Sequence, residues 1–256
     1  MGKALISEVL NSKNCTLGGA LEAQNDRNIG LDVGDFTNRE KLGVILDGSV
    51  SNFLNKIDVA IDFSNPQGTL NNISKAANTG VPVVSGTTGL SEEQMEKIKL
   101  AARDIPIVWA PNMSIGINLA LALTYQAVSV LDSTFDIEIF ELHHKEKIDS
   151  PSGTAIALAR VACEARNLSY DKNVELSNYR EPGPRPKNSV GITVSRGGNE
   201  AGEHKLMLIG EGERIEIKHM ASNRSVFAKG AVLAAKWVVT KTPGFYGMKD
   251  VLNIKY

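Results

Sequence analysis

Two adjacent histidines and two lysines gather in one short segment near the middle of the chain. The segment reads Glu141-Leu-His-His-Lys-Glu-Lys-Ile-Asp-Ser-Pro-Ser-Gly-Thr-Ala155 and holds two of the protein's four histidines. Histidine changes its charge close to neutral pH and often donates or accepts protons in enzymes. The segment therefore predicts a site that donates a proton and attracts an anion, with His143, His144, Lys145 and Lys147 as the candidate side chains.

The same segment runs into the start of a helix. Ser152 is a residue type favoured at a helix N-cap, and the apolar run from Ala155 follows it. A helix start presents unpaired N–H groups at the positive end of the helix dipole, so it attracts anions. We expect the N–H groups of Gly153 and Thr154 to bind a small acid beside the proton donor. Taken alone, Ser-Gly-Thr is equally typical of an ordinary helix cap.

Composition limits the classes of function. The 256 residues are 42% hydrophobic and 22% charged, with a net charge of −1, which gives no support for binding nucleic acid or a polybasic membrane contact. The two cysteines, Cys15 and Cys163, form no CxxC pair, so we expect a reducing cytoplasm and no metal site. No apolar run reaches the length of a membrane span.

The first part of the chain alternates strand and helix patterns. Such alternation predicts a doubly wound parallel sheet, in which ligands bind at the carboxyl ends of the strands. The expected strands are Leu17–Leu21, Ile57–Phe63, Val81–Ser85 and Ile105–Ala110, with helices over 66–79 and 91–103 between them. Their carboxyl ends carry Glu22, Asp62-Phe-Ser, Gly86-Thr-Thr and Ala110-Pro-Asn-Met.

The pattern changes after an apolar helix over 115–132. A strand over Phe135–Glu141 and a helix over 153–166 precede three successive strands, whose Gly- and Glu-rich connections suit hairpins. We therefore predict an α/β protein: a Rossmann-type doubly wound parallel sheet plus a second α+β domain with a mixed or antiparallel sheet. The expected domains are 1–114 with 224–256, and 115–223. The three strands are Ser189–Arg196, Glu203–Ile209 and Arg214–Met220, and His204 and His219 in them are interpreted as structural or surface residues.

The chain opens on a helix rather than on a strand and a glycine-rich turn. In a dinucleotide-binding fold the acidic ribose ligand follows the glycine fingerprint by about 20 residues. Counting back from Glu22 reaches Gly2, which then corresponds to the last glycine of a fingerprint. This spacing predicts a truncated chain that lacks its first strand.

These motifs together resemble the 4-hydroxy-tetrahydrodipicolinate reductase (dihydrodipicolinate reductase) family over nearly the whole chain. The segment from Glu141 to Ala155 is similar to the family pattern E-x-H-H-x-x-K-x-D-x-P-S-G-T-A. Further similar motifs are Asp62-Phe-Ser, Gly86-Thr-Thr-Gly89, Ala110-Pro-Asn-Met-Ser114, Arg196-Gly-Gly with Gly202-Glu-His204, Phe227-Ala-Lys-Gly-Ala231 and Gly247-Met-Lys-Asp-Val-Leu252.

The resemblance implies a cytoplasmic homotetramer that reduces a cyclic imine dicarboxylate with NADH or NADPH in lysine and diaminopimelate biosynthesis. It implies that His143 and Lys147 are catalytic and that His144, Gly153 and Thr154 bind the substrate. It also implies that one group of residues binds the cofactor: Met1, Glu22, Gly86, Thr87, Thr88, Ala110, Pro111, Asn112 and Met113.

Two departures from the family pattern affect the cofactor. Most of the glycine-rich loop is missing, and Ala23 follows Glu22 where some members have Arg, a natural partner for the 2′-phosphate of NADP. Two alternatives stay open at this point. One is a truncated, catalytically impaired chain that acts only as an oligomer-forming or substrate-binding module. The other is a different two-domain Rossmann reductase acting on an amino or imino acid.

Overall fold

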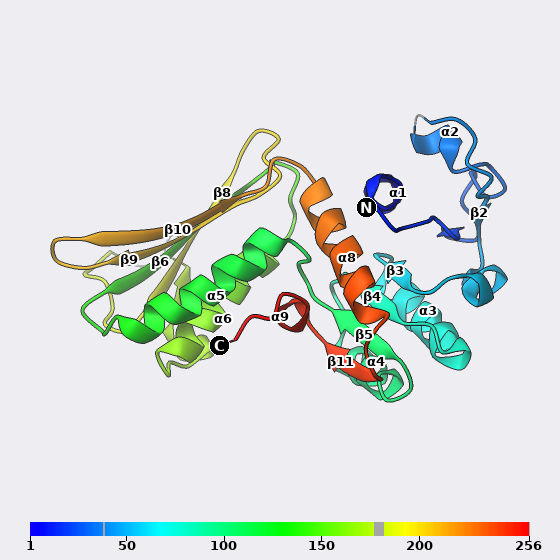
Figure 1. Cartoon of the computed structure of the whole chain (residues 1–256). Coiled ribbons are helices and arrows are strands. Elements are labelled where there is room, and N and C mark those ends of the chain that lie inside the picture. Colours follow the sequence, from blue (N-terminus) through cyan, green and yellow to red (C-terminus); the bar gives the residue numbers. More distant parts are fainter. Residues whose placement is uncertain (38, 177–181, 256) are drawn as a thin grey trace. The chain divides into compact units, whose positions relative to one another are not determined.

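The computed structural model describes residues 1–37, 39–176 and 182–255 (Figure 1). The chain forms two compact units. The first joins Met1–Ser114 to Ser225–Asn253, and the second consists mainly of Ile115–Arg224. Among the described residues, no helix is both long and apolar enough to span a membrane.

The first unit is built on parallel strands, as the sequence predicted. One sheet has the order β11 (Gly244–Tyr246), β5 (Pro106–Trp109), β4 (Val83–Ser85) and β3 (Ala60–Asp62), and every pair in it is parallel. A second, small sheet pairs β1 (Ala20–Leu21) with β2 (Leu46–Asp47), also in parallel. The predicted doubly wound class is thus confirmed for this unit.

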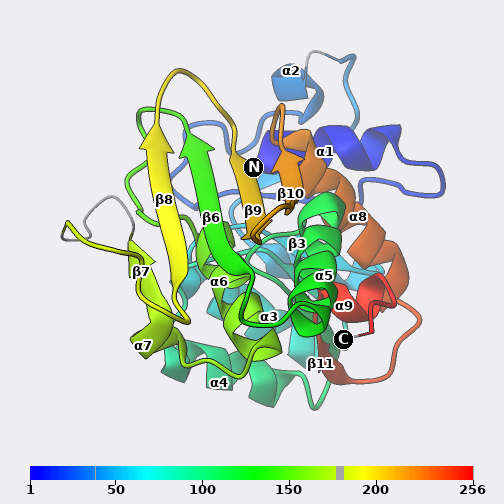
Figure 2. The same cartoon turned by 90° about the vertical axis from the view of Figure 1, so that its left-hand side faces the viewer.

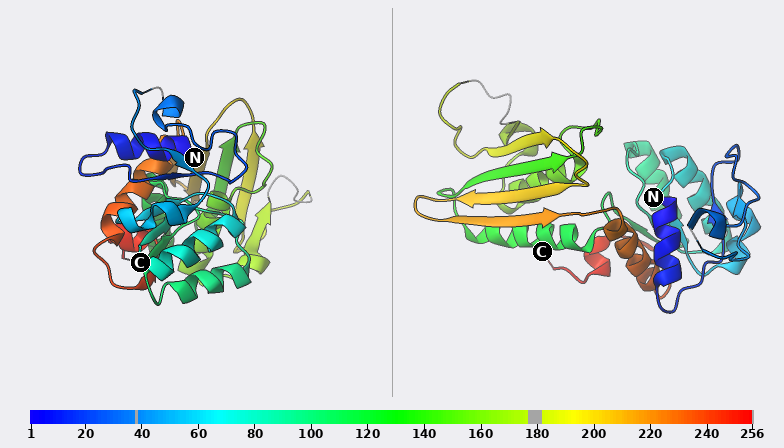
Figure 3. Two further views of the ribbon diagram at one scale, coloured as in Figure 1. Left: turned by 90° about the vertical axis from the view of Figure 1, so that its right-hand side faces the viewer. Right: turned by 90° about the horizontal axis from the view of Figure 1, so that it is seen from above.

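Helices cover both faces of the four-stranded sheet. Successive residues of a strand point to opposite faces, so neighbouring residues pack in different cores. Val83 and Ile107 pack in one core with α3 (Pro66–Thr79) and α4 (Glu92–Ala101). Val84 and Val108 pack in another core with α8 (Ser225–Val238), against which α1 (Gly2–Asn11) lies (Figure 3). Shorter elements complete the unit: α2 (Gly34–Thr37), η1 (Val50–Asn52), η2 (Leu54–Lys56) and α9 (Met248–Val251).

The second unit is a five-stranded mixed sheet with helices on one face (Figures 1 and 2). Its order is β10 (Arg214–Met220), β9 (Glu203–Ile209), β6 (Asp136–His143), β8 (Val190–Arg196) and β7 (Val174–Leu176). Strand β6 pairs antiparallel with β9 and parallel with β8. Helices α5 (Ile115–Val130) and α6 (Gly153–Ala165) share its core, and the short α7 (Tyr170–Asn173) precedes β7.

One expectation about this sheet was wrong. The three late strands do not form two successive hairpins, because β6 lies between β8 and β9, and only β9 and β10 pair as neighbours in sequence. Strands lie about 4.8 Å apart, so the six residues 197–202 that join β8 to β9 are long enough to pass over one strand. Consequently β6 is paired along both edges.

Candidate active site

One face of β6 changes from apolar to polar along its length. Ile137, Ile139, Glu141 and His143 all point to the buried side of the strand, and each is buried. The two isoleucines belong to the core under the sheet. The same alternation that builds the core therefore places a carboxylate and an imidazole at the carboxyl end of the strand.

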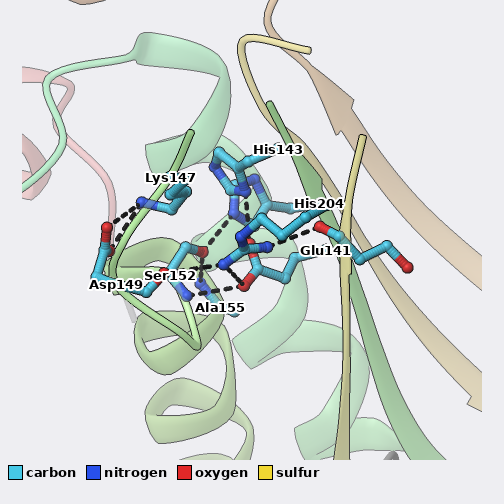
Figure 4. Close-up of polar contacts among 9 residues, drawn as sticks. Glu141, His143, Lys147, Asp149, Ser152, Ala155 and His204 are labelled. Atoms are coloured by element: carbon cyan, nitrogen blue, oxygen red, sulfur yellow. Dashed lines mark hydrogen bonds and ion pairs between the residues drawn. The ribbon is translucent and has the colours of Figure 1, made fainter. Parts of the chain in front are cut away.

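Glu141 and His143 form a close pair (Figure 4). Oε2 of Glu141 lies 2.5 Å from Nδ1 of His143, and the side chain of Glu141 is fully buried. Because a carboxylate only accepts, the proton between them belongs to Nδ1 of His143. The remaining nitrogen, Nε2, is the one that can exchange a proton with a ligand.

The other oxygen of Glu141 binds two further groups. Oε1 accepts hydrogen bonds from the backbone N–H of Ser152 at 2.9 Å and from Nη2 of Arg196 at 3.2 Å. Burial alone would raise the pKa of the Glu141 carboxyl, but the bonds from His143, Ser152 and Arg196 outweigh burial and hold its pKa at about 2. Glu141 is therefore a carboxylate at neutral pH.

Ser152 connects this carboxylate to His204. Its Oγ lies 2.8 Å from Nε2 of His204 and accepts the N–H of Ala155 at 3.1 Å, so Ser152 caps α6. Burial, with help from the charge of His143, lowers the pKa of His204 to about 3, so its ring is neutral. Ser152, at the start of α6, is therefore bonded to Glu141, to His204 and to the first turn of its own helix.

Lys147 lies beside this cluster in the loop between β6 and α6 (Figure 4). Its Nζ is 2.7 and 2.8 Å from the two carboxylate oxygens of Asp149. Arg196 also donates to the carbonyl of Asp149 at 2.9 Å, so one guanidinium joins the loop to Glu141. The ammonium is thus held close to β6 by a counter-ion in its own loop.

Gly202 leaves room next to Nε2 of His143. Its φ of +153° is one that residues with a Cβ rarely adopt, and a Cβ there would lie 3.0 Å from Nε2 of His143. The turn around it is hydrogen-bonded to the end of β6 and the loop that follows, through His144 N–H to the Glu200 carbonyl and Gly197 N–H to the His143 carbonyl. The motif Arg196-Gly-Gly with Gly202-Glu-His204 therefore lies directly against His143.

The structure brings the proposed proton donor and the helix start together, and it adds Glu141 and His204 to the candidate site. His143 and Ser152 share Glu141, while Gly153 is exposed and Thr154 half-buried at the start of α6. His144 is half-buried. His204 was interpreted as structural or surface, but it is buried and contacts the His143 ring with centroids 5.0 Å apart. Its position in phase with buried Leu206 and Leu208 of β9 was the available signal.

The residues expected to bind a cofactor lie in the first unit. Met1 is the N-cap of α1. Glu22 follows β1 in the small sheet, while Gly86–Thr88 and Ala110–Met113 follow β4 and β5 at the carboxyl edge of the four-stranded sheet. That edge is where doubly wound sheets bind dinucleotides.

A buried chain of side chains fixes one of these loops. The hydroxyl of Thr69 in α3 donates to Oγ1 of Thr87 at 2.7 Å, and the indole N–H of Trp109 donates to the Thr87 carbonyl at 3.0 Å. The loop after β4 is therefore held by both a helix and a neighbouring strand, and this edge fits a dinucleotide.

Glu141, His143 and His204 also bring three potential metal ligands within 4.8 Å of one another. His204 lies 61 positions after His143, too far for spacing in the sequence to reveal the group. However, Oε2 and Nδ1 form an ion pair with each other, and Nε2 of His204 is hydrogen-bonded to Ser152. We interpret the group as a hydrogen-bond network, and the expected absence of a metal stays a prediction.

Comparisons with known proteins agree over the whole chain. The family model "Dihydrodipicolinate reductase, N-terminus" matches residues 1–113, and "Dihydrodipicolinate reductase, C-terminus" matches residues 116–252. The chain is 40% identical over 255 residues to the 4-hydroxy-tetrahydrodipicolinate reductase of Magnetococcus marinus, covering 100% of this chain and 95% of that protein. It is 39% identical to the enzyme of the same name from Acinetobacter baumannii, covering 99% of this chain and 93% of that protein.

A solved structure has the same fold. The dipicolinate-bound dihydrodipicolinate reductase from Paenisporosarcina sp. TG-14 matches with a TM-score of 0.76 at 24% identity, covering 97% of this chain and 94% of that one. With such coverage of the relatives, the comparisons do not support the expectation of a truncated chain.

The buried carboxylate predicts a stability change in acid. The pKa of Glu141 falls from its ordinary 4.5 to about 2 on folding, so its contribution is present above pH 4.5 and is lost as the pH falls from 4.5 through 2. This shift corresponds to about 3 kcal/mol. Urea unfolding should show Glu141→Gln less stable than the wild type by that order at pH 7, with the difference shrinking toward pH 3.

The exposed Glu211 provides the matched control. Glu211→Gln should change the free energy of unfolding by less than about 0.5 kcal/mol at any of these pH values. A Glu141→Gln deficit that stays constant from pH 7 to pH 3 would contradict the assignment of the charge to Glu141.

Proposed function

Because the chain belongs to the dihydrodipicolinate reductase family, we propose that the Glu141–His143 pair is its proton-donating centre. The chain is an NAD(P)H-dependent 4-hydroxy-tetrahydrodipicolinate reductase of lysine and diaminopimelate biosynthesis. It reduces 4-hydroxy-tetrahydrodipicolinate to tetrahydrodipicolinate. The observation that carries the residue assignment is the contact of a fully buried carboxylate with Nδ1 of His143.

The protein's share of the chemistry is a proton and the binding of carboxylates. The bound reduced nicotinamide supplies the hydride. In our proposal Nε2 of His143 gives its proton to the substrate, and the other ring proton stays on Nδ1, where it faces Glu141. The anionic Glu141 stabilises the charged imidazolium before transfer and holds the correct tautomer afterwards, as an acidic partner does in catalytic triads.

The substrate's charged groups are proposed to bind around α6. Backbone N–H groups of Gly153 and Thr154 precede the first intrahelical hydrogen bond, from Ile156 to Ser152, and the helix dipole favours an anion there. Lys147 and His144 complete the set of positive or proton-bearing groups, Lys147 as the second catalytic cation. The dipicolinate in the Paenisporosarcina structure, a cyclic dicarboxylate, supports this class of ligand.

The cofactor is proposed to bind the carboxyl edge of the parallel strands in the first unit. Glu22 would bind the ribose hydroxyls, and the loops after β4 and β5 would line the nicotinamide end. The first unit, expected at 1–114 and 224–256, is thus the proposed dinucleotide-binding domain, and 115–223 the substrate-binding and oligomerisation domain. We also propose a cytoplasmic location.

Loss of the proton donor or of the cation should reduce turnover strongly. His143→Gln keeps a hydrogen-bonding side chain but cannot carry the imidazolium proton, and Lys147→Ala removes the ammonium paired with Asp149. Each should lower kcat by about 10²–10⁴-fold, the range for loss of a general acid. Steady-state kinetics with unfolding curves for each variant measure this.

Lys172→Ala removes an exposed lysine of the same unit and should leave kcat unchanged. Near-normal turnover in both His143→Gln and Lys147→Ala would remove these two residues from the mechanism, while leaving the reductase activity itself in place.

Ala23 predicts the cofactor preference. The residue directly after Glu22 is Ala23 and not a cation that could pair with the 2′-phosphate of NADPH, so the enzyme should use NADH at least as well as NADPH. Ala23→Arg should lower the KM for NADPH and leave the KM for the dicarboxylate unchanged. A strong NADPH preference in the wild type, measured as a ratio of kcat/KM values, would refute the prediction.

The helix-free face of the mixed sheet supports a homotetramer. Helices α5 and α6 pack on one face, while Phe140, Leu142, Met207 and Ile209 point to the other and remain partly exposed. Sedimentation equilibrium should give four times the mass of one 27.6 kDa chain. Phe140→Glu should shift the population toward smaller species, and a monomeric wild type at micromolar concentration would contradict this assignment.

A further inference from the structure

Ser152 has more hydrogen-bond partners than a helix cap needs. A serine cap requires only the bond from its oxygen to an N–H of the first turn, here that of Ala155. Ser152 also donates its backbone N–H to Glu141 and places its hydroxyl 2.8 Å from His204. All three groups are buried, so none of these bonds is exchanged with water.

The bond between Ser152 and His204 uses the capacity that the cap leaves over. Oγ accepts the Ala155 N–H with one lone pair, so its hydroxyl proton and its second lone pair both remain for Nε2 of His204, 2.8 Å away. The ring of His204 is neutral, so Nε2 accepts in one tautomer and donates in the other. His204 comes from β9 and faces Glu141 across the antiparallel pair with β6, so its ring is placed by the sheet rather than by the loop.

We propose that His204 is a positioning residue, whose hydrogen bond with the Ser152 hydroxyl orients the first turn of α6 so that the Gly153 and Thr154 N–H groups receive a substrate carboxylate. The inference rests on the proposed function of that helix start. Loss of the His204 ring frees the hydroxyl to rotate and removes one of the two bonds of this buried oxygen, leaving the bond from the Ala155 N–H. The helix start then loses its connection to the sheet on one side.

A set of three variants separates this role from simple structural support. His204→Leu removes one partner of this bond, and Ser152→Ala removes the other. His204→Gln places an amide, which can accept or donate, where it can bond the same hydroxyl. We expect His204→Leu and Ser152→Ala each to raise the KM for the dicarboxylate and the Kd for dipicolinate by about tenfold, the effect of a misdirected hydrogen bond worth about 1.4 kcal/mol.

The affected constants distinguish positioning from folding. The KM for NADH should stay within twofold of the wild type in every variant, and His204→Gln should restore most of the dipicolinate affinity. The double variant His204→Leu/Ser152→Ala should bind dipicolinate no more weakly than Ser152→Ala alone, because Ser152→Ala already removes the bond that His204→Leu removes, together with the cap bond from Ala155. Ser91→Ala removes a comparable cap from α4, where Ser91 accepts from Gln94, and should leave dipicolinate binding unchanged.

Several results would overturn the inference. One is a folded His204→Leu variant with wild-type dipicolinate affinity, and another is a parallel loss of NADH and dicarboxylate binding with a lowered Tm. Additive losses in the double variant would also count against it. If His204→Leu does not fold, Ser152→Ala decides alone, and unchanged affinity there rejects the proposal. A wild type without reductase activity would instead reject the proposed function, because dipicolinate binding is measured separately.

Discussion

The buried carboxylate of Glu141 is the interaction on which the proposed site depends. Removing a charge from water is costly unless polar contacts replace the lost hydration, and Glu141 has an ion-pair contact with His143 at one oxygen and two hydrogen bonds at the other. One oxygen faces the imidazole of His143, and the other faces the start of α6 and the guanidinium of Arg196. The proton-donating side and the anion-binding side of the site are therefore set by one group. Neither side can shift without breaking a bond to a charge that has no access to water.

Sequence patterns predicted the main elements of the fold well and their neighbours less well. Alternating apolar residues and helix caps located most long helices and strands to within a few residues, since these signals are local. Strands β2, β7 and β11 have two or three residues each and lack such a pattern, so the sequence did not reveal them. The position of β6 between β8 and β9 was also missed, because strand pairing depends on contacts across a distance in sequence and not on turn composition.

The sequence likewise identified the residues of the candidate site that are close together in the chain and missed a distant one. His143, Lys147 and the Ser152–Thr154 turn belong to one continuous segment, so motif and spacing were enough to identify them. His204 lies 52 positions from Ser152, and only the register of β9 against β6 brings the two together. Its burial phase in β9 was visible in the sequence, but a buried histidine is consistent with an inert core residue until its partner is known. The assignment of cofactor and substrate to separate units stays a prediction.

The change from isoleucine to acid along β6 has a consequence for how such a protein can vary. Each residue advances a strand by about 3.3 Å, and side chains two apart share a face. A one-residue insertion in β6 would turn Glu141 and His143 to the open face of the sheet. A two-residue insertion would keep the face but carry the pair about 7 Å beyond Arg196 and His204. Changes of length in this unit are therefore confined to the loops, and the interior of β6 is the part of the chain least able to gain or lose a residue.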